Sequence, residues 1–215
     1  MEINKHDNEL YLYKLYNKEL MKDTNLDWFQ VEHIYKNFGN TPGIYPDTLY
    51  LILNIINNYN IKRIVELGSG VSTLYFSKIC ENKGIQFTSY EEKEEWRNIT
   101  HKLLNYYNLN TKIENFTSLN DCNLNYNLDC DLIFIDCSDE MRIKLLESNK
   151  LNNIPIIMVD DSERKSLSVP YSKFISNSKR YGFYTYNGVG RIDRHLVINT
   201  IYSIDIDNMV KRLKL

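Results

Sequence analysis

Acidic residues follow several strand-like segments of this sequence, and one of them precedes a glycine-rich turn. Residues 64–73 read IVELGSGVST, which places Glu66 two positions before Gly68 in a Gly-x-Gly turn. The backbone amides of such turns usually hold a phosphate, and a phosphate site would avoid a nearby carboxylate. A carboxylate beside this turn therefore predicts a ligand that carries positive charge.

Three further strand-like segments end in carboxylates. Glu91 follows IQFTSY, Asp136 follows LIFI, and Asp160 and Asp161 follow IIMV. In open α/β sheets, ligands bind outside the carboxyl ends of the parallel strands, where these side chains would meet. The sequence therefore predicts an acidic cleft at one edge of a sheet.

The elements that would position these residues alternate between strands and helices. Short segments rich in β-branched and aromatic residues are predicted to be parallel strands, namely residues 62–67, 85–91, 111–116, 131–136 and 154–160. Helical patterns cover residues 72–84, 92–107, 139–150 and 168–179. Such an alternation is typical of a doubly wound sheet with helices on both faces.

The two ends of the chain depart from this alternation. Residues 181–187 and 194–200 are strand-like with no helix between them, so we expect a hairpin whose last strand runs antiparallel to its neighbour. Residues 8–38 are predicted to form one or two helices, and residues 46–60 another. The predicted fold is therefore an α/β, Rossmann-like mixed sheet over residues 44–215, preceded by a helical extension over residues 1–43.

The composition argues against nucleic-acid-binding, membrane-spanning and secreted proteins. The 215 residues carry a net charge of −2, which gives no basic surplus to indicate nucleic acid. No apolar run approaches the ~20 residues of a membrane span, and the charged N-terminus does not resemble a secretion signal. The cysteines form no Cys-x-x-Cys pair and are expected to be free thiols; they are Cys80, Cys122, Cys130 and Cys137. We therefore expect a cytoplasmic protein without a membrane partner.

The sequence resembles the class I S-adenosylmethionine-dependent methyltransferases over roughly residues 44–199. VELGSGVST stands where that family carries its acidic-x-Gly-x-Gly motif, and SYEE stands where a ribose-binding acid ends the second strand. DLIFID and VDDSERK match the fourth and fifth strands, and the terminal hairpin matches the family's last two strands. One departure is Ser72, which replaces a frequent third glycine.

The resemblance implies an enzyme, a transferase that uses S-adenosylmethionine as its cofactor. The sulfonium and ammonium groups of that molecule suit an acidic cleft, and a carboxylate at Glu91 offers two oxygens to a ribose diol. Asp136 is the catalytic candidate, as a contact to the acceptor or as its base, although it could instead shape the cofactor pocket. The predicted cofactor-binding residues are Glu66, Gly68, Ser69, Gly70, Ser72, Thr73, Glu91 and Asp136.

A metal site is an alternative use of the same edge. Asp136, Asp160 and Asp161 could hold magnesium or calcium, as in the catechol-type O-methyltransferases, whose segment before the first strand is similar to NTPGIYPDTLYLIL. However, Asp161 stands where those enzymes usually have asparagine, and IDCSDEMR lacks the lysine that follows their strand-four acid. A competing interpretation pairs Asp160 or Asp161 with Arg164. The sequence therefore favours a site without metal.

The predicted function is methyl transfer to an oxygen or nitrogen of a small molecule. Trp28 and Tyr45 lie in segments that could line the acceptor pocket, and the N-terminal helices could shape this pocket or form a homodimer contact. The alternatives are a metal-dependent catechol-type enzyme and a catalytically inactive module that binds a cofactor or a partner. A nicotinamide-dependent dehydrogenase is disfavoured because Thr73 stands where its motif requires a third glycine.

Overall fold

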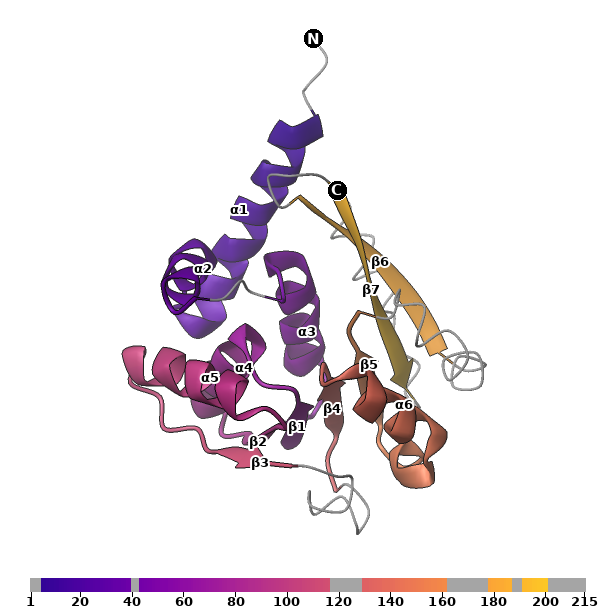
Figure 1. The fold of residues 1–215 in the computed structure, drawn as a ribbon. Helices are drawn as coiled ribbons and strands as arrows, with labels where there is room; N and C mark the ends of the chain where they lie inside the picture. The colour runs from indigo at the N-terminus through magenta and orange to yellow at the C-terminus, as the bar shows by residue number, and fades with distance from the viewer. Residues whose placement is uncertain (1–4, 40–42, 117–128, 162–177, 187–190, 201–215) are drawn as a thin grey trace.

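A computed structural model describes residues 5–39, 43–116, 129–161, 178–186 and 191–200 (Figure 1). Within them, seven strands form one sheet. The strands are β1 (Arg63–Leu67), β2 (Gln86–Glu91), β3 (Ile113–Asn115), β4 (Leu132–Ile135), β5 (Ile156–Val159), β6 (Ser178–Tyr186) and β7 (Arg191–Thr200). Their order across the sheet is β3-β2-β1-β4-β5-β7-β6.

Strand direction divides this sheet into two parts. The neighbours from β3 to β5 are parallel, whereas β7 runs antiparallel to both β5 and β6. The first strand, β1, pairs with β2 on one side and with β4 on the other, so the strand order reverses there. Ligands of open α/β sheets bind at such a switch point. The carboxyl ends of β1, β2 and β4 are thus the expected place for a ligand.

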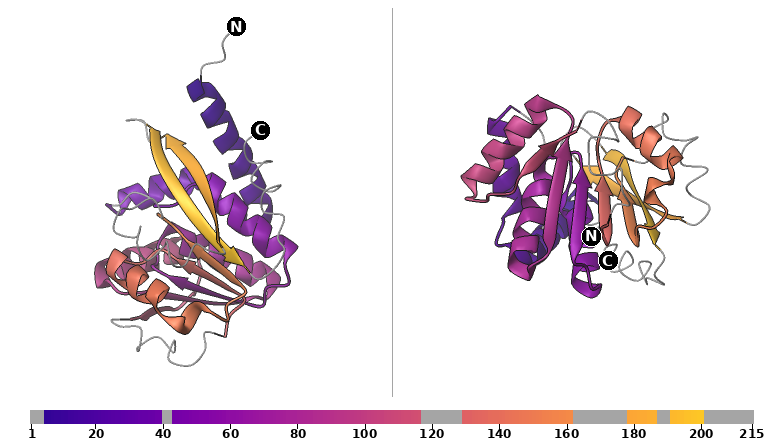
Figure 2. Two further views of the ribbon diagram at one scale, coloured as in Figure 1. Left: turned by 90° about the vertical axis from the view of Figure 1, so that its right-hand side faces the viewer. Right: turned by 90° about the horizontal axis from the view of Figure 1, so that it is seen from below.

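Helices cover both faces of the sheet, which confirms the doubly wound α/β fold (Figure 2). They are α1 (Lys5–Thr24), α2 (Trp28–Asn37), α3 (Pro46–Asn58), α4 (Val71–Lys83), α5 (Glu94–Tyr106) and α6 (Asp139–Glu147), with a 3-10 helix η2 (Asn149–Leu151). The layer with α3, α4 and α5 lies on one face, and α6 lies on the other. The N-terminal helix α1 packs on α3 and α4, outside this first layer.

The strand β4 shows how the sheet serves two cores. Leu132 and Phe134 belong to the core beneath α3, α4 and α5, whereas Ile133 and Ile135 belong to the core beneath α6. All four side chains are buried. The uninterrupted apolar run LIFI is therefore explained by burial on both faces, as expected for an inner parallel strand.

Local signals set several helix ends that matter for the site. Pro46 occupies the first turn of α3, where its missing N–H costs no hydrogen bond. Gly84 ends α4 with a left-handed φ of 67°, a conformation that glycine adopts without a steric penalty. Ser138 caps α6 by accepting a hydrogen bond from the Met141 N–H.

Most predicted elements are found with small shifts at their ends. The predicted helix over residues 168–179 overlaps β6 in its last two residues, and the rest of it lies outside the described residues. Cys80, Cys130 and Cys137 are buried free thiols as expected, and Cys122 lies outside the described residues. The domain boundary after residue 43 stays a prediction. Among the described helices, none is long and apolar enough to span a membrane.

Candidate functional site

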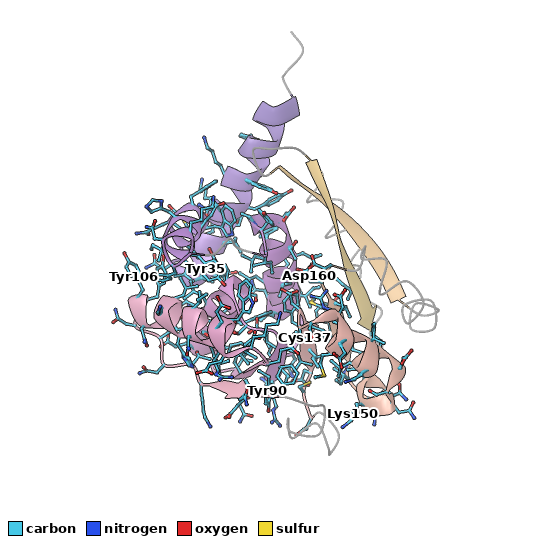
Figure 3. All side chains as sticks on the ribbon, viewed as in Figure 1. Tyr35, Tyr90, Tyr106, Cys137, Lys150 and Asp160 are labelled. Carbon is cyan, nitrogen blue, oxygen red and sulfur yellow. The ribbon has the colours of Figure 1, made fainter. Side chains whose placement is uncertain are left out.

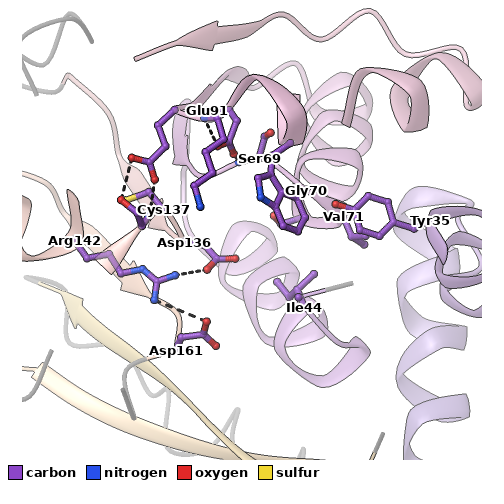
Figure 4. Close-up of a pocket in the computed structure, with 16 residues that line it drawn as sticks. Tyr35, Ile44, Ser69, Gly70, Val71, Glu91, Asp136, Cys137, Arg142 and Asp161 are labelled. Atoms are coloured by element: carbon purple, nitrogen blue, oxygen red, sulfur yellow. Dashed lines mark hydrogen bonds and ion pairs between the residues drawn. The ribbon is translucent and has the colours of Figure 1, made fainter. Parts of the chain in front are cut away.

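A cleft of about 250 Å³ opens at the carboxyl ends of β1, β2 and β4 (Figure 4). Its walls come from the loops that follow these three strands and β5, from the helices α2, α4, α5 and α6, and from the segment before α3. Among the predicted cofactor-binding residues, those that line it are Ser69, Gly70, Ser72, Glu91 and Asp136. Its volume is close to the ~300 Å³ at which small-molecule sites begin.

Gly68 brings the loop after β1 against the end of β4. Its φ is +98°, and a Cβ placed there would lie 2.2 Å from the carbonyl oxygen of Asp136. Only glycine allows this backbone-to-backbone approach. At Gly70, by contrast, an added Cβ would meet the Tyr35 hydroxyl at 3.8 Å, an ordinary contact. Gly68 therefore positions the loop from below, and Ser69 and Gly70 form its cleft-facing part.

Glu66 lies beneath the loop and does not line the cleft. Its side chain is fully buried, and it accepts hydrogen bonds of 2.6 Å from three hydroxyls, those of Ser72, Thr73 and Ser89. Burial raises the pKa of Glu66 to about 7, and the three hydroxyls limit that rise. The structure thus places Glu66 and Thr73 under the loop, and neither is among the residues that line the cleft.

The hydroxyl of Ser72 explains the departure from a third glycine in the motif. It donates to Glu66 Oε1, while the neighbouring Thr73 hydroxyl donates to Glu66 Oε2 and accepts from the Gly70 N–H. These bonds tie the first turn of α4 to β1. A glycine at position 72 would lose one of them, so the serine stabilises the loop in this chain.

The carboxylate of Glu91 lines the cleft and is also hydrogen-bonded to the loop after β1. Its Oε2 accepts the Ser69 N–H at 2.7 Å, and its Oε1 accepts the Lys93 N–H at 2.9 Å. The side chain is buried, which raises its pKa above the ordinary value, although these backbone hydrogen bonds counteract the rise. The predicted ribose-binding acid therefore lies at the cleft, fixed in orientation by two backbone groups.

Asp136 faces a buried arginine that the sequence did not single out. Arg142 Nη2 lies 2.5 Å from Asp136 Oδ1, and Nη1 lies 3.2 Å from the Asp160 carbonyl oxygen and 3.9 Å from Asp161 Oδ2 (Figure 4). The predicted partner Arg164 lies outside the described residues, and within them Asp161 pairs with Arg142 instead. A guanidinium thus fills the space between the two strand-end carboxylates.

Other lining residues were also missed. Tyr35 belongs to α2 (Figure 3) and is one of the residues that line the cleft (Figure 4). Burial raises the pKa of Tyr35, and Glu91 and Asp136 raise it further, so its hydroxyl stays protonated. Trp96, in the first turn of α5, lines the cleft as well. Nothing in the sequence distinguishes Tyr35 from the other tyrosines, of which the chain has 17 in total.

Trp28 and Tyr45 do not line this cleft. Their ring centroids lie 5.7 Å apart, and Tyr13 and Phe29 join them in one aromatic group. Trp28 is 2% exposed and belongs to the core. The segments that contain them do reach the cleft, but through Tyr35, Gly43 and Ile44 and not through these two rings.

Comparison with known proteins identifies the fold. No protein-family model and no curated protein matches the sequence. Among solved structures, a candidate caffeoyl-CoA O-methyltransferase of Staphylococcus aureus aligns with a TM-score of 0.65 and 19% identity, over 89% of this chain and 99% of that one. A methyltransferase of Podospora anserina with bound S-adenosylhomocysteine aligns with a TM-score of 0.60 and 12% identity, over 94% and 98%. The chain has the fold of the class I S-adenosylmethionine-dependent methyltransferases.

This methyltransferase fold also occurs in proteins with other acceptors. A tRNA methyltransferase of Aquifex aeolicus aligns with a TM-score of 0.51 and 16% identity, over 77% of this chain and 72% of that one. Identities this low show the shared fold, and the activity has to be argued from the site. Within the methyltransferase fold of this chain, the cleft lies at the switch point between β1 and β4.

Proposed function

We propose that this chain is an S-adenosylmethionine-dependent methyltransferase that acts on an oxygen or nitrogen of a small molecule. The observation that carries the proposal is that Glu91 and Asp136 line one cleft, on either side of the loop containing Ser69 and Gly70. S-adenosylmethionine supplies a methyl group that is already activated on a sulfonium. The protein therefore has mainly to hold cofactor and acceptor in line, ~3–3.5 Å apart at the reacting atoms.

The residues of the cleft fit this cofactor in chemistry. Each oxygen of Glu91 accepts one backbone N–H, and a carboxylate has about four acceptor positions, so it can still bind a ribose diol. Trp96 provides an aromatic face for the adenine. Four carboxylates line the cleft against two cationic side chains, so a negative charge remains that favours a ligand with a sulfonium and an ammonium group; the carboxylates are those of Glu91, Glu92, Asp136 and Asp161, and the cations are Lys93 and Arg142.

Asp136 is the proposed contact to the acceptor. Its side chain is 24% exposed and lines the cleft, so a bound hydroxyl or amine can reach it. Arg142 cannot serve as the base because a guanidinium does not lose its proton in proteins. Where the acceptor has to lose a proton, we expect the Asp136 carboxylate to take it.

A small-molecule acceptor is favoured over nucleic acid by charge. The chain has a net charge of −2, and the cleft is lined by carboxylates, whereas nucleic-acid sites depend on cationic groups that neutralise phosphates. Tyr35 supports a role for the N-terminal helices in shaping the acceptor side of the cleft. A homodimer contact by these helices and a cytoplasmic location stay proposals.

Ligand-dependent thermal unfolding tests the proposed function. We expect S-adenosylhomocysteine and S-adenosylmethionine to raise the melting temperature with increasing ligand concentration, because they bind only the folded chain. NAD⁺ is the matched control and should have no effect. A screen of hydroxyl and amine acceptors, read out as released S-adenosylhomocysteine, then tests transfer. Stabilisation by NAD⁺ alone would contradict the proposal, and stabilisation by the methyl donor without any transfer would favour an inactive binding module.

A further inference from the structure

The ends of β4 and β5 raise the question of what balances their charge. Asp136 follows β4, and Asp160 and Asp161 follow β5, so three carboxylates meet at one edge of the sheet. Three oxygen-rich side chains in such a place are a typical site for a divalent cation. In this structure, the guanidinium of Arg142 lies between the carboxylates of Asp136 and Asp161 and donates to the backbone carbonyl of Asp160 (Figure 4).

Arg142 reaches the carboxylates from α6, which lies on the face of the sheet away from α3, α4 and α5. It lies on α6, beside Met141 and Leu145, both of which are buried in the core beneath that helix. The side chain of Arg142 is only 1% exposed. A buried charge of this kind is stable only when opposite charges and hydrogen bonds surround it, and here Asp136, Asp161 and the Asp160 carbonyl do so.

The charged state of Arg142 follows from these neighbours. Burial by itself would lower the pKa of Arg142, but Asp136, followed by smaller contributions that include Asp161, raises it above its ordinary value. The guanidinium of Arg142 therefore stays positively charged at neutral pH. In this way it neutralises carboxylates that would otherwise repel one another.

The residues present do not fit a metal ion. Magnesium and calcium need several oxygens at about 2.0–2.6 Å, and the space between Asp136 and Asp161 is filled by a group that offers only N–H donors. Elsewhere in the described part of the chain, no group of three histidine, cysteine, aspartate or glutamate side chains is arranged to hold a metal.

We propose that Arg142 is a built-in cation that takes the place of a divalent metal and holds Asp136 in position at the cleft. Methyl transfer then needs no divalent cation, and the acceptor needs no chelating pair of oxygens: a single hydroxyl or amine at Asp136 suffices. This part of the inference rests on the proposed function. The occupation of the carboxylate site by Arg142 can be tested without any methyl acceptor.

Binding of Mn²⁺ to the native full-length chain is the first test. Mn²⁺ is followed by electron paramagnetic resonance, in which bound and free ions are distinguished. We expect no stoichiometric binding at micromolar to low millimolar concentrations, because Arg142 occupies the space between the carboxylates. One Mn²⁺ bound per chain at micromolar concentration, and lost in Asp136→Asn, would overturn the inference.

The second test removes the guanidinium. Arg142→Ala should lower the melting temperature and should bind Mn²⁺ at least about tenfold more tightly than the native chain, since the cation between Asp136 and Asp161 is then removed. Millimolar Mg²⁺, Ca²⁺ or Mn²⁺ should recover part of the lost melting temperature. Arg142→Lys keeps a positive charge and should be less destabilised and respond less to the ions. Arg63→Ala, which removes a partly exposed arginine paired with Asp129, is the control and should not respond.

The outcomes separate this inference from the proposed function. An Arg142→Ala chain that folds but shows no response to the three ions would contradict the role of Arg142 as a substitute for a metal. If that variant does not fold, the Mn²⁺ titration of the native chain still decides. Stabilisation by S-adenosylhomocysteine is measured on the same samples. A native chain that binds both Mn²⁺ and this ligand would overturn the inference about Arg142 and support the proposed cofactor.

Discussion

Glu66 and Glu91 lie near the ends of neighbouring strands beside the same loop, yet they have different surroundings. Glu66 is paired in register with Ser89, which lies two residues before Glu91. At about 3.3 Å per residue, Glu66 is therefore about 7 Å deeper in the sheet than Glu91. The deeper carboxylate is enclosed by three hydroxyls, whereas the outer one accepts two backbone N–H groups and faces the cleft.

The role of an acidic residue at a strand end therefore depends on how deep in the sheet the residue lies. Glu66 is level with Ser89 on β2 and with Phe134 on β4. Glu91 and Asp136 each lie two residues closer to the carboxyl edge of the sheet, at the level of Gly68. We call Glu66 with its partners Ser72, Thr73 and Ser89 the inner cluster. The inner cluster holds the loop in shape, and the outer acids, Glu91 and Asp136, line the cleft.

The largest expected effect is the loss of stability in Glu66→Ala. The substitution leaves three buried hydroxyls without their acceptor and opens a cavity, so we expect the free energy of unfolding to fall by roughly 4 kcal/mol. Urea unfolding at pH 6, followed by circular dichroism, measures it. Glu91→Ala is the comparison and should lose less than half as much, because it leaves two backbone N–H groups without their acceptor instead of three buried hydroxyls. Equal losses in the two variants would contradict the distinction between the inner cluster and the outer acids.

The second effect is a pH dependence that belongs to the inner cluster. The pKa of Glu66 is about 7 in the folded chain and 4.5 as the ordinary value, so the folded state retains a proton that the unfolded chain releases. Stability from this group is complete below pH 4.5 and is lost as the pH rises through 7, by about 3 kcal/mol in total. Unfolding of the native chain should therefore become easier from pH 5 to pH 8. Glu66→Gln, which cannot release a proton, should show a smaller slope, and identical slopes would contradict the assignment.

The third effect concerns cofactor affinity. Glu91→Ala removes the proposed ribose contact and the acceptor for the Ser69 N–H, so we expect the dissociation constant of S-adenosylhomocysteine to rise at least ~30-fold, or about 2 kcal/mol. Isothermal titration calorimetry measures it on a variant shown to be folded. Glu66→Gln should change this affinity less than threefold, on the order of 0.6 kcal/mol. An unchanged affinity in Glu91→Ala would remove the cofactor contact from the proposal.

The smallest effect tests one hydroxyl of the inner cluster. Ser89→Ala deletes a single donor to Glu66 while two others remain, so the free energy of unfolding should fall by about 1 kcal/mol. Affinity for S-adenosylhomocysteine should stay at the native value because Ser89 does not line the cleft. Calorimetry of the variant checks both quantities. A loss of affinity without a loss of stability would place Ser89 in the ligand site instead.

The sequence predicted the alternation of strands and helices because apolar strands and amphipathic helices follow different periods. It also predicted which strand ends meet at the cleft, since parallel strands place their carboxyl ends at one edge. It did not predict that Glu66 turns inward. The position of Glu66 depends on the register between β1 and β2, and the residues of either strand alone do not determine that register. The resemblance to a family located the motif without settling which way the carboxylate points.

Arg142 and Tyr35 were missed for two different reasons. Arg142 lies on a helix beside Met141 and Leu145, and a charge on that buried side was a signal of a buried partner that sequence reasoning did not use. Tyr35 gives no local signal, because the cleft recruits it by the packing of α2 rather than by any motif. The sequence analysis singled out Trp28 instead of Tyr35, but the Trp28 side chain is buried in the core.

The most direct test of the central claim is a crystal structure of the chain with S-adenosylhomocysteine bound. We expect the ribose hydroxyls at the Glu91 carboxylate, the homocysteine part beside Ser69 and Gly70, and the sulfur turned toward the side of Asp136. An adenosine bound away from these residues, or a ribose in contact with Glu66 instead of Glu91, would contradict the central claim.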